Sequence, residues 1–147
     1  MTRLLRIFSV AILMIASLPA ANAADYSKQK VVYHINIDGQ SGTTYRSALG
    51  NIQNHINAVS PDNIEVEVVM HGDGLGLLMA ANDDYGLQTR IGGLKNQNVR
   101  FRICANTLEG RNIALDDLYD AWDEDVVPSG VAELSKLQQN GFTYVKP

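Results

Sequence analysis

The sequence predicts an α/β fold in which helices cover a mainly parallel sheet of about five strands. Short runs rich in β-branched residues alternate along the chain with segments whose apolar residues recur at helical spacing. The order strand, helix, strand, helix is typical of parallel sheets, because each parallel pair needs a crossover connection. A domain of this length holds a single hydrophobic core.

The N-terminus predicts a secretory signal peptide at residues 1–23, followed by a single domain at residues 24–147. Arg3 and Arg6 give a positive start, residues 7–18 are almost wholly apolar, and Ala21-Asn22-Ala23 has the form of a cleavage site. An uncleaved membrane tether is the alternative, although the apolar run is short for a bilayer. We expect a periplasmic protein that is soluble and free of the membrane in its mature form.

The first strand is predicted at Val31–Ile37, because this run is dense in β-branched and aromatic residues and ends at Asp38-Gly39. A helix follows from Thr44, and Pro61 ends it. Its buried stripe is predicted to contain Tyr45, Ala48, Leu49, Ile52, Ile56 and Val59.

The middle of the chain predicts two more strands, at Glu65–Met70 and Val99–Ile103. Between them we expect a short helical segment at Leu75–Ala81 and a helix at Asp84–Asn96. The apolar residues of the second helix are Tyr85, Leu87, Ile91 and Leu94.

The C-terminal part predicts an irregular or weakly helical region after Cys104, a short strand at Asp125–Val127 and a last strand at Phe142–Val145. Ser129 is the predicted N-cap of a helix that runs to Asn140 and stops at Gly141. Buried anchors are expected at Ile113, Leu115, Leu118 and Trp122 in the irregular region, and at Val131, Leu134 and Leu137 in the helix.

Charged residues alternate with apolar ones in two of these strands, at Glu65, Glu67, Arg100 and Arg102. Parallel strands covered on both faces are usually apolar throughout. One face of the sheet is therefore partly open or completed by another subunit, or these are edge strands whose long side chains reach past the helices.

The net charge excludes two classes of partner. The formal charge is −4, and removal of the two signal arginines leaves ten basic against sixteen acidic residues. An acidic surface repels phosphate backbones and anionic membranes, so we expect no nucleic acid partner.

Cys104, the only cysteine, is the first candidate for chemistry. Ligands of parallel sheets gather beyond the carboxyl ends of the strands, where residues 38–43, 71–74, 104–107 and 128–130 are predicted to lie. A thiolate there is a nucleophile, with His71 as a possible base and Asp73 available to orient it. The alternatives are an inert buried thiol and a histidine bonded to loop backbone. His34 and His55 are interpreted as structural or surface residues.

No cofactor or metal is predicted. The glycine- and hydroxyl-containing loop at Asp38–Thr44 is loosely similar to a flavin phosphate loop, but an acidic residue opens it. Residues 72–76 lack the spacing of the dinucleotide fingerprint, and the phosphate-binding Walker lysine is absent. His71 and Asp73 have no third metal ligand at a recognisable spacing.

Four motifs together resemble the DsrE/DsrF-like family, which includes sulfur-relay subunits, and most of all an exported branch of it. They are the Val-Val-Tyr-His-Ile-Asn strand, His71-Gly72-Asp73-Gly74, the segment Phe101–Leu108 around Cys104, and the segment from Val126 to Leu134 that leads to Gly141–Tyr144. The resemblance implies a flavodoxin-like three-layer α/β/α fold, assembly into a homotrimer or homohexamer, and a persulfide carried on Cys104.

Two functions follow as hypotheses. The first is a periplasmic sulfur-binding or sulfur-transfer protein, at most a sulfur carrier or sulfurtransferase component, which meets separate donor and acceptor proteins. In it His71 supports Cys104, and the ligand-binding residues are Gly72, Asp73, Gly74, Asn106, Thr107 and Ser129. The second is a non-enzymatic oligomeric module that binds a small ligand and in which the thiol is structural.

Overall fold

The computed structural model describes residues 26–39 and 42–147. The predicted signal peptide and part of the loop at 38–43 lie outside the described residues. Within the described part of the chain, every helix is too short or too polar to cross a bilayer.

The sheet has five parallel strands in the order β4-β3-β2-β1-β5. The strands are β1 (Gln29–Ile35), β2 (Ile64–Met70), β3 (Arg100–Cys104), β4 (Val126–Val127) and β5 (Thr143–Val145). The predicted flavodoxin-like three-layer α/β/α fold is confirmed. The first strand begins and ends two residues earlier than predicted, at Gln29 and Ile35.

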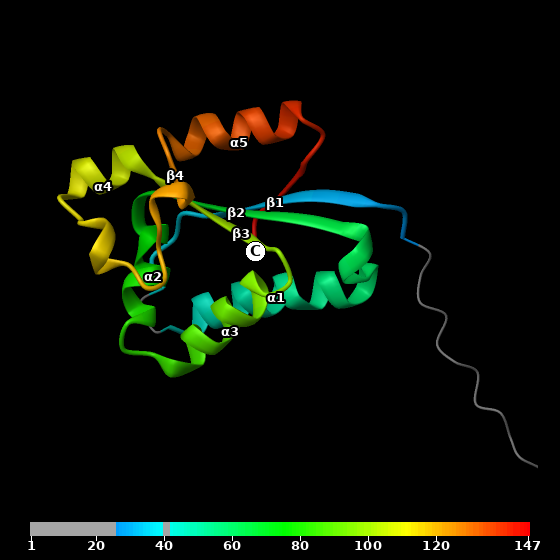
Figure 1. Ribbon diagram of the computed structural model, residues 1–147, viewed down its shortest axis with the longest axis horizontal. Helices are drawn as coiled ribbons and strands as arrows, with labels where there is room; N and C mark the ends of the chain where they lie inside the picture. Colours follow the sequence, from blue (N-terminus) through cyan, green and yellow to red (C-terminus); the bar gives the residue numbers. More distant parts are fainter. Residues whose placement is uncertain (1–25, 40–41) are drawn as a thin grey trace, which may run out of the picture.

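Helices form a layer on each side of this sheet, as Figure 1 shows. They are α1 (Thr43–Val59), α2 (Gly76–Ala81), α3 (Tyr85–Lys95), α4 (Ala105–Arg111) and α5 (Gly130–Gln139). Strands β1 to β4 follow one another in one direction, whereas α5 leads from β4 at one edge back to β5 at the other. Because crossovers are right-handed, this return places α5 on the face opposite α1 and α3.

The main core lies between the sheet and the layer of α1, α2 and α3. Five of the six residues of the predicted α1 stripe lie in this core, and the sixth, Val59, is buried as well. A smaller cluster lies under α5 and contains Val32, Val69, Leu134, Leu137 and Phe142. The helical periodicity of α1 therefore identified its buried face correctly.

Two apolar residues that were expected to be buried are exposed, Trp122 by 60% and Val131 by 64%. Tyr85, an apolar residue of the predicted second helix, is 82% exposed. Residues three apart on a helix drift by about 60° per step, so Val131 lies about 120° around α5 from Leu137. Tyr85 is the first residue of α3 and lies on the far side from its buried stripe. Trp122 turns its indole N–H to the carboxylate of Asp120, at 3.2 Å, and its ring toward solvent.

The region after Cys104 is more regular than predicted, because residues 105–111 form the helix α4. Two 3₁₀ turns follow, at Leu115–Asp117 and Asp123–Asp125. This correction matters for the site, since a helix that starts directly after Cys104 fixes the backbone N–H groups beside the sulfur.

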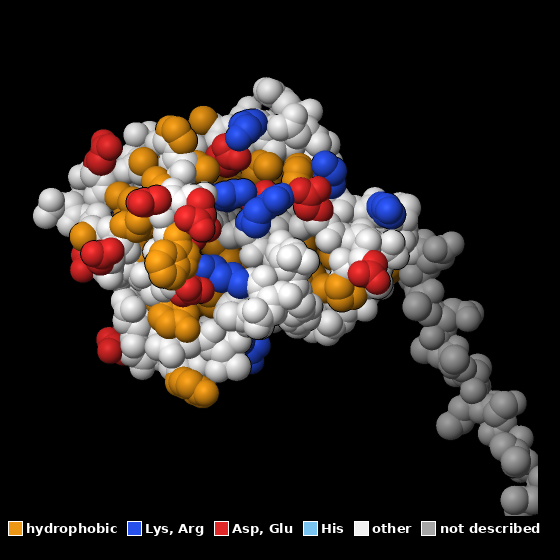
Figure 2. Space-filling model, viewed as in Figure 1, with side chains coloured by type: hydrophobic (Ala, Val, Ile, Leu, Met, Phe, Trp, Pro, Cys, Tyr) orange, Lys and Arg blue, Asp and Glu red, His pale blue; other side chains and the backbone are white. Residues whose placement is uncertain are grey.

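The charged residues of β2 and β3 pair with one another on the α5 face. Glu67, only 3% exposed, accepts from the guanidinium groups of Arg100 at 2.7 Å and Arg102 at 2.8 Å. Arg100 also reaches Glu65, at 2.6 Å. Figure 2 shows basic and acidic side chains next to one another beneath α5. Long paired side chains thus account for the alternating pattern, and Arg100, about half exposed, leaves part of this face open.

Candidate functional site

Three of the four predicted loops meet around Cys104, the last residue of β3. The backbone N–H of Gly72 donates to the hydroxyl of Thr107 at 3.0 Å, which joins the loop after β2 to α4. Gly130, the first residue of α5, packs against both His71 and Cys104. The carboxyl ends of β2, β3 and β4 therefore form one site, and its thiol is only 4% exposed.

The sulfur of Cys104 is surrounded by hydrogen-bond donors. Burial alone would raise the pKa of the thiol, because it disfavours the thiolate. The hydroxyl of Thr107 and the backbone N–H groups of Gly130, Thr107 and Asn106 lower it, and together they outweigh burial. The net result is a thiol pKa below its ordinary value, as reactive cysteines require.

The loop after β2 orients the Thr107 hydroxyl. Thr107 is buried, and its oxygen already accepts the N–H of Gly72, so its own proton is directed to another acceptor, the sulfur. Gly72 has φ +55°, a conformation that side chains other than glycine rarely adopt. The Gly72 backbone thus acts on the sulfur through the Thr107 side chain.

Gly130 brings the start of α5 close to the sulfur because it has no side chain. A Cβ at this position would lie 3.0 Å from Cβ of His71 and 3.3 Å from Cβ of Cys104. Ser129 is the N-cap of α5, as predicted, and its hydroxyl accepts the N–H of Ala132 at 3.3 Å. Its separate prediction as a ligand-binding residue stays a prediction.

His71 belongs to a chain of hydrogen bonds that the sequence analysis missed. Its Nε2 lies 2.7 Å from Nε2 of His34, and Nδ1 of His34 lies 2.7 Å from the hydroxyl of Tyr144. Burial, with the charge of Lys146, lowers the pKa of His71; burial, with His71 and Lys146, lowers that of His34 to about 4. Both imidazoles are neutral at neutral pH, so a protonated His71 does not account for the lowered thiol pKa.

The hydrogen bonds of the histidines add to the sequence analysis. His34, interpreted there as a structural or surface residue, is 9% exposed and bonded to His71. Asp73 pairs with Arg111 at 2.7 Å, and the group that orients His71 is His34. A signal was present in the strand pattern: alternation places His34 on the same face as Val32 and the charged residues of β2.

The other predicted ligand-binding residues have different surroundings. Gly74 packs against β1 so closely that a Cβ there would lie 1.9 Å from the carbonyl oxygen of Ile35, so its absent side chain permits the turn after β2. Asp73 and Asn106 are exposed at the rim of the site. The Asp73 carboxylate pairs with Arg111, and the assignment of both residues as ligand-binding stays a prediction.

The sequence matches the model of the DsrE/DsrF-like family over residues 19–147. The chain belongs to this family. The match extends over nearly all of the chain and includes each segment that surrounds Cys104. At the level of the family, this membership supports a protein of the sulfur-relay type.

Two solved structures resemble this DsrE/DsrF-like protein. The first is a protein of unknown function, MTH1491 from Methanobacterium thermoautotrophicum, with 30% identity, a TM-score of 0.68, and 82% of this chain and 100% of that chain covered. The second is the ychN protein from E. coli, with 18% identity, a TM-score of 0.63, and 81% and 99% covered, which supports the fold alone. No curated protein matches the sequence.

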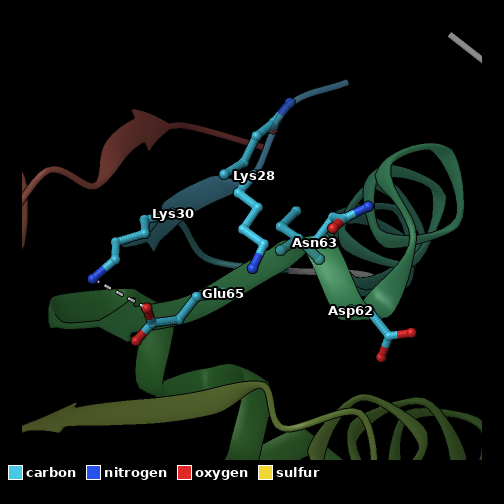
Figure 3. A pocket seen from close by; sticks show the side chains of 7 residues that line it. Lys28, Lys30, Asp62, Asn63 and Glu65 are labelled. Carbon is cyan, nitrogen blue, oxygen red and sulfur yellow. Dashed lines mark ion pairs between the residues drawn. The ribbon is translucent and has the colours of Figure 1, made fainter. Parts of the chain in front are cut away.

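A pocket of about 310 Å³ lies at the opposite end of the sheet, where β1 and β2 begin. Figure 3 shows Lys30 of β1 and Lys28, which precedes β1, extending toward Glu65 and Asn63. Nζ of Lys30 lies 3.3 Å from the Glu65 carboxylate. Parallel sheets bind ligands at the carboxyl ends of their strands, and this pocket lies at the amino ends. We therefore place the candidate site at Cys104.

Proposed function

We propose that this protein is a periplasmic sulfur carrier in which Cys104 accepts a sulfane sulfur and holds it as a persulfide. One observation carries the proposal: four hydrogen-bond donors surround the Cys104 sulfur and lower the pKa of its thiol. Membership of the DsrE/DsrF-like family supports it independently.

The hydrogen-bond donors around the sulfur suit both states of the carrier, the unloaded thiolate and the loaded persulfide. A thiolate is needed to attack the outer sulfur of a donor, and amide and hydroxyl donors stabilise it without a fixed cation. The same groups stay beside the inner sulfur after loading. The outer sulfur is bonded to the inner one at about 2.05 Å and is one atom further from the backbone of Cys104. A carrier needs this arrangement, because its partner proteins must reach only the outer atom.

Mass spectrometry of the intact protein tests the proposal. The protein purified after expression of the whole chain is incubated with polysulfide, and with thiosulfate plus a sulfurtransferase. We expect an adduct of about +32 Da that disappears in Cys104→Ser. The absence of a Cys104-dependent adduct under both conditions would refute the persulfide.

Burial of Cys104 favours a second function, an oligomeric module that binds a small ligand and contains a structural thiol. Alkylation of the native protein separates the two. A structural thiol reacts only after unfolding, whereas a carrier thiol reacts in the native state, and its rate rises with pH from below the ordinary thiol range.

Assembly and location are further parts of the proposal. The partly open α5 face, with exposed Arg100 and Glu65, supports assembly into a homotrimer or homohexamer. Separate donor and acceptor proteins would load and unload Cys104. Light scattering of the purified protein measures the size of the oligomer. The intact mass of the protein isolated from the periplasmic fraction shows whether residues 1–23 are removed. A monomer, or an uncleaved chain, would contradict the respective part.

A further inference from the structure

The most unusual feature beside Cys104 is the pair of imidazoles joined through their Nε2 atoms at 2.7 Å. A bond of this kind needs one proton between two nitrogens, so one ring donates and the other accepts. The second bond of His34, from Nδ1 to the Tyr144 hydroxyl at 2.7 Å, continues the chain. Tyr144 is 40% exposed, and the chain therefore runs from the interior of the site to solvent.

This chain has two arrangements in which all three groups are neutral. In the first, Nε2–H of His71 donates to His34, Nδ1–H of His34 donates to the Tyr144 oxygen, and Nδ1 of His71 carries a lone pair. In the second, every proton has moved one place toward Tyr144 and solvent: the Tyr144 hydroxyl donates to His34, Nε2–H of His34 donates to His71, and Nδ1 of His71 has gained a proton. His71 is thus a base in one arrangement and a donor in the other.

His71 lies beside Cys104. Met70 and Ile103 are register partners in β2 and β3, and His71 and Cys104 are the next residues of each chain segment. They therefore lie at the same height on neighbouring strands, whose backbones are about 4.8 Å apart. Both side chains border Gly130. A carried sulfur adds one atom to the Cys104 side chain, beside which His71 lies.

We propose that Tyr144, His34 and His71 form a proton-transfer chain that sets the protonation state of the sulfur carried on Cys104, with His34 and Tyr144 as positioning residues for His71. The inference rests on the proposed carrier function and adds the residues that let one sulfur be both received and released.

The chemistry of sulfur transfer requires such a proton. On loading, the Cys104 thiolate attacks the outer sulfur of a donor persulfide R–S–SH; the donor S–S bond breaks, R–S⁻ leaves, and Cys104–S–SH keeps the proton. This proton passes to His71 while Tyr144 releases one to solvent, and the carrier rests as Cys104–S–S⁻. On delivery the proton returns, because an acceptor thiolate attacks the outer sulfur of the protonated form. The acceptor leaves as a persulfide, and Cys104 is again a thiolate.

The surroundings leave this chain isolated from other acids. Burial lowers the pKa of both imidazoles, and the nearby charge that also acts on them is the cation of Lys146. The carboxylates on the elements packed around the pair are Glu65 and Glu67 in β2, Asp73 in the turn after β2, and Glu133 on α5. Each has a cationic partner: Arg100 for Glu65, Arg100 with Arg102 for Glu67, Arg111 for Asp73, and Lys136 for Glu133. The other titratable group beside the pair is the thiol of Cys104 on β3. Among the described residues, no carboxylate is bonded to either imidazole.

Three variants test the chain. His34→Gln keeps a hydrogen-bonding side chain that cannot relay a proton, and Tyr144→Phe removes one half-exposed hydroxyl with little risk to the fold. His55→Gln is the matched control, because His55 bonds to Tyr33 and Gln29 outside the site. The loaded protein is mixed with a small thiol, and loss of the +32 Da adduct is followed from pH 5 to 9. We expect the first two variants to transfer sulfur at least fivefold more slowly at neutral pH, with a displaced pH midpoint, and His55→Gln to match the wild type.

A measurement on the unloaded protein separates this inference from the carrier function. Imidazole ¹⁵N NMR reports which nitrogen of each ring carries the proton. We expect the His34 and His71 signals to titrate together, and His34→Gln to displace the titration midpoint of His71 by at least half a pH unit. Failure of the wild type to load would refute the carrier function alone. Independent titration of the two rings, or transfer profiles of His34→Gln and Tyr144→Phe that coincide with the wild type, would overturn the chain.

Discussion

The hydroxyl of Thr107 offers the sharpest test of how the site lowers the pKa of Cys104. Thr107→Val keeps the shape of the side chain and removes the donor. A hydrogen bond to a charged group contributes about 1.5–3 kcal/mol. Since one pH unit corresponds to about 1.36 kcal/mol, the pKa of the thiol should rise by about one to two pH units.

The effect on reactivity is smaller than the rise in pKa. Each unit lowers the thiolate fraction at neutral pH about tenfold, but a more basic thiolate is about threefold more nucleophilic. Alkylation at pH 7 should therefore slow by about three- to tenfold, and the midpoint of the rate profile should move to higher pH. Thr107→Ser, which keeps the hydroxyl, should behave as the wild type.

Stability gives a second readout of the same change. Thr107→Val leaves the Gly72 N–H without its acceptor, which should cost about 1–3 kcal/mol in the free energy of unfolding measured with urea. If the alkylation profile of Thr107→Val coincided with those of the wild type and Thr107→Ser, the hydroxyl would have no part in stabilising the thiolate, and the reasoning would be refuted.

Three further changes test the frame of the site. Gly130→Ala should lower the free energy of unfolding by about 1–3 kcal/mol, because the added methyl group overpacks the site. Gly93→Ala, in mid-helix with no atom within 4 Å of the added Cβ, should raise it by about 0.5–1 kcal/mol. Equal effects of the two variants in urea denaturation would contradict the close approach at Gly130. Glu67→Gln should cost about 3 kcal/mol, because it removes the buried carboxylate charge that pairs with two guanidinium groups, against less than about 1 kcal/mol for the more exposed Glu65→Gln. A loss below about 1 kcal/mol for both would refute a role for burial. The pKa of His34 is lowered from 6.5 to about 4 in the folded protein, so the unfolded chain binds more protons between these two pH values. The free energy of unfolding should therefore fall by up to ~3 kcal/mol as the pH drops from 6.5 toward 4. His34→Gln should flatten this part of the pH profile measured with urea.

Local patterns in the sequence were sufficient to predict the layers of the fold. The α1 stripe from Tyr45 to Val59 is buried as predicted, because helical periodicity records which side of an amphipathic helix faces a core. Ser129 and Gly141 mark the ends of α5 as predicted, since capping and positive φ are local requirements. Val131 and Trp122 were misjudged, because an apolar side chain near an element's end is buried only if another element covers it.

The site was predictable only in part, since its geometry depends on strand order. Cys104 and His71 were identified because each follows a strand, and parallel strands end at the same edge. The contact between His34 and His71 depends on β1 lying beside β2 in a register that pairs His34 with Val69, which no local pattern records. The Thr107 donor likewise depends on α4 beginning directly after Cys104.

The return of the chain from β4 to β5 completes the site at both ends. The order β4-β3-β2-β1-β5 makes α5 cross the whole sheet, so its first residue, Gly130, brings an N–H group to the sulfur beside β4. The strand that follows pairs Tyr144 with Val32 and places its hydroxyl against His34. One helix and one strand thus supply both a donor to the thiolate and the outer end of the histidine chain. A shift of α5 along the sheet would disturb both together, and Gly130→Ala should therefore change the imidazole titration as well as the alkylation of Cys104.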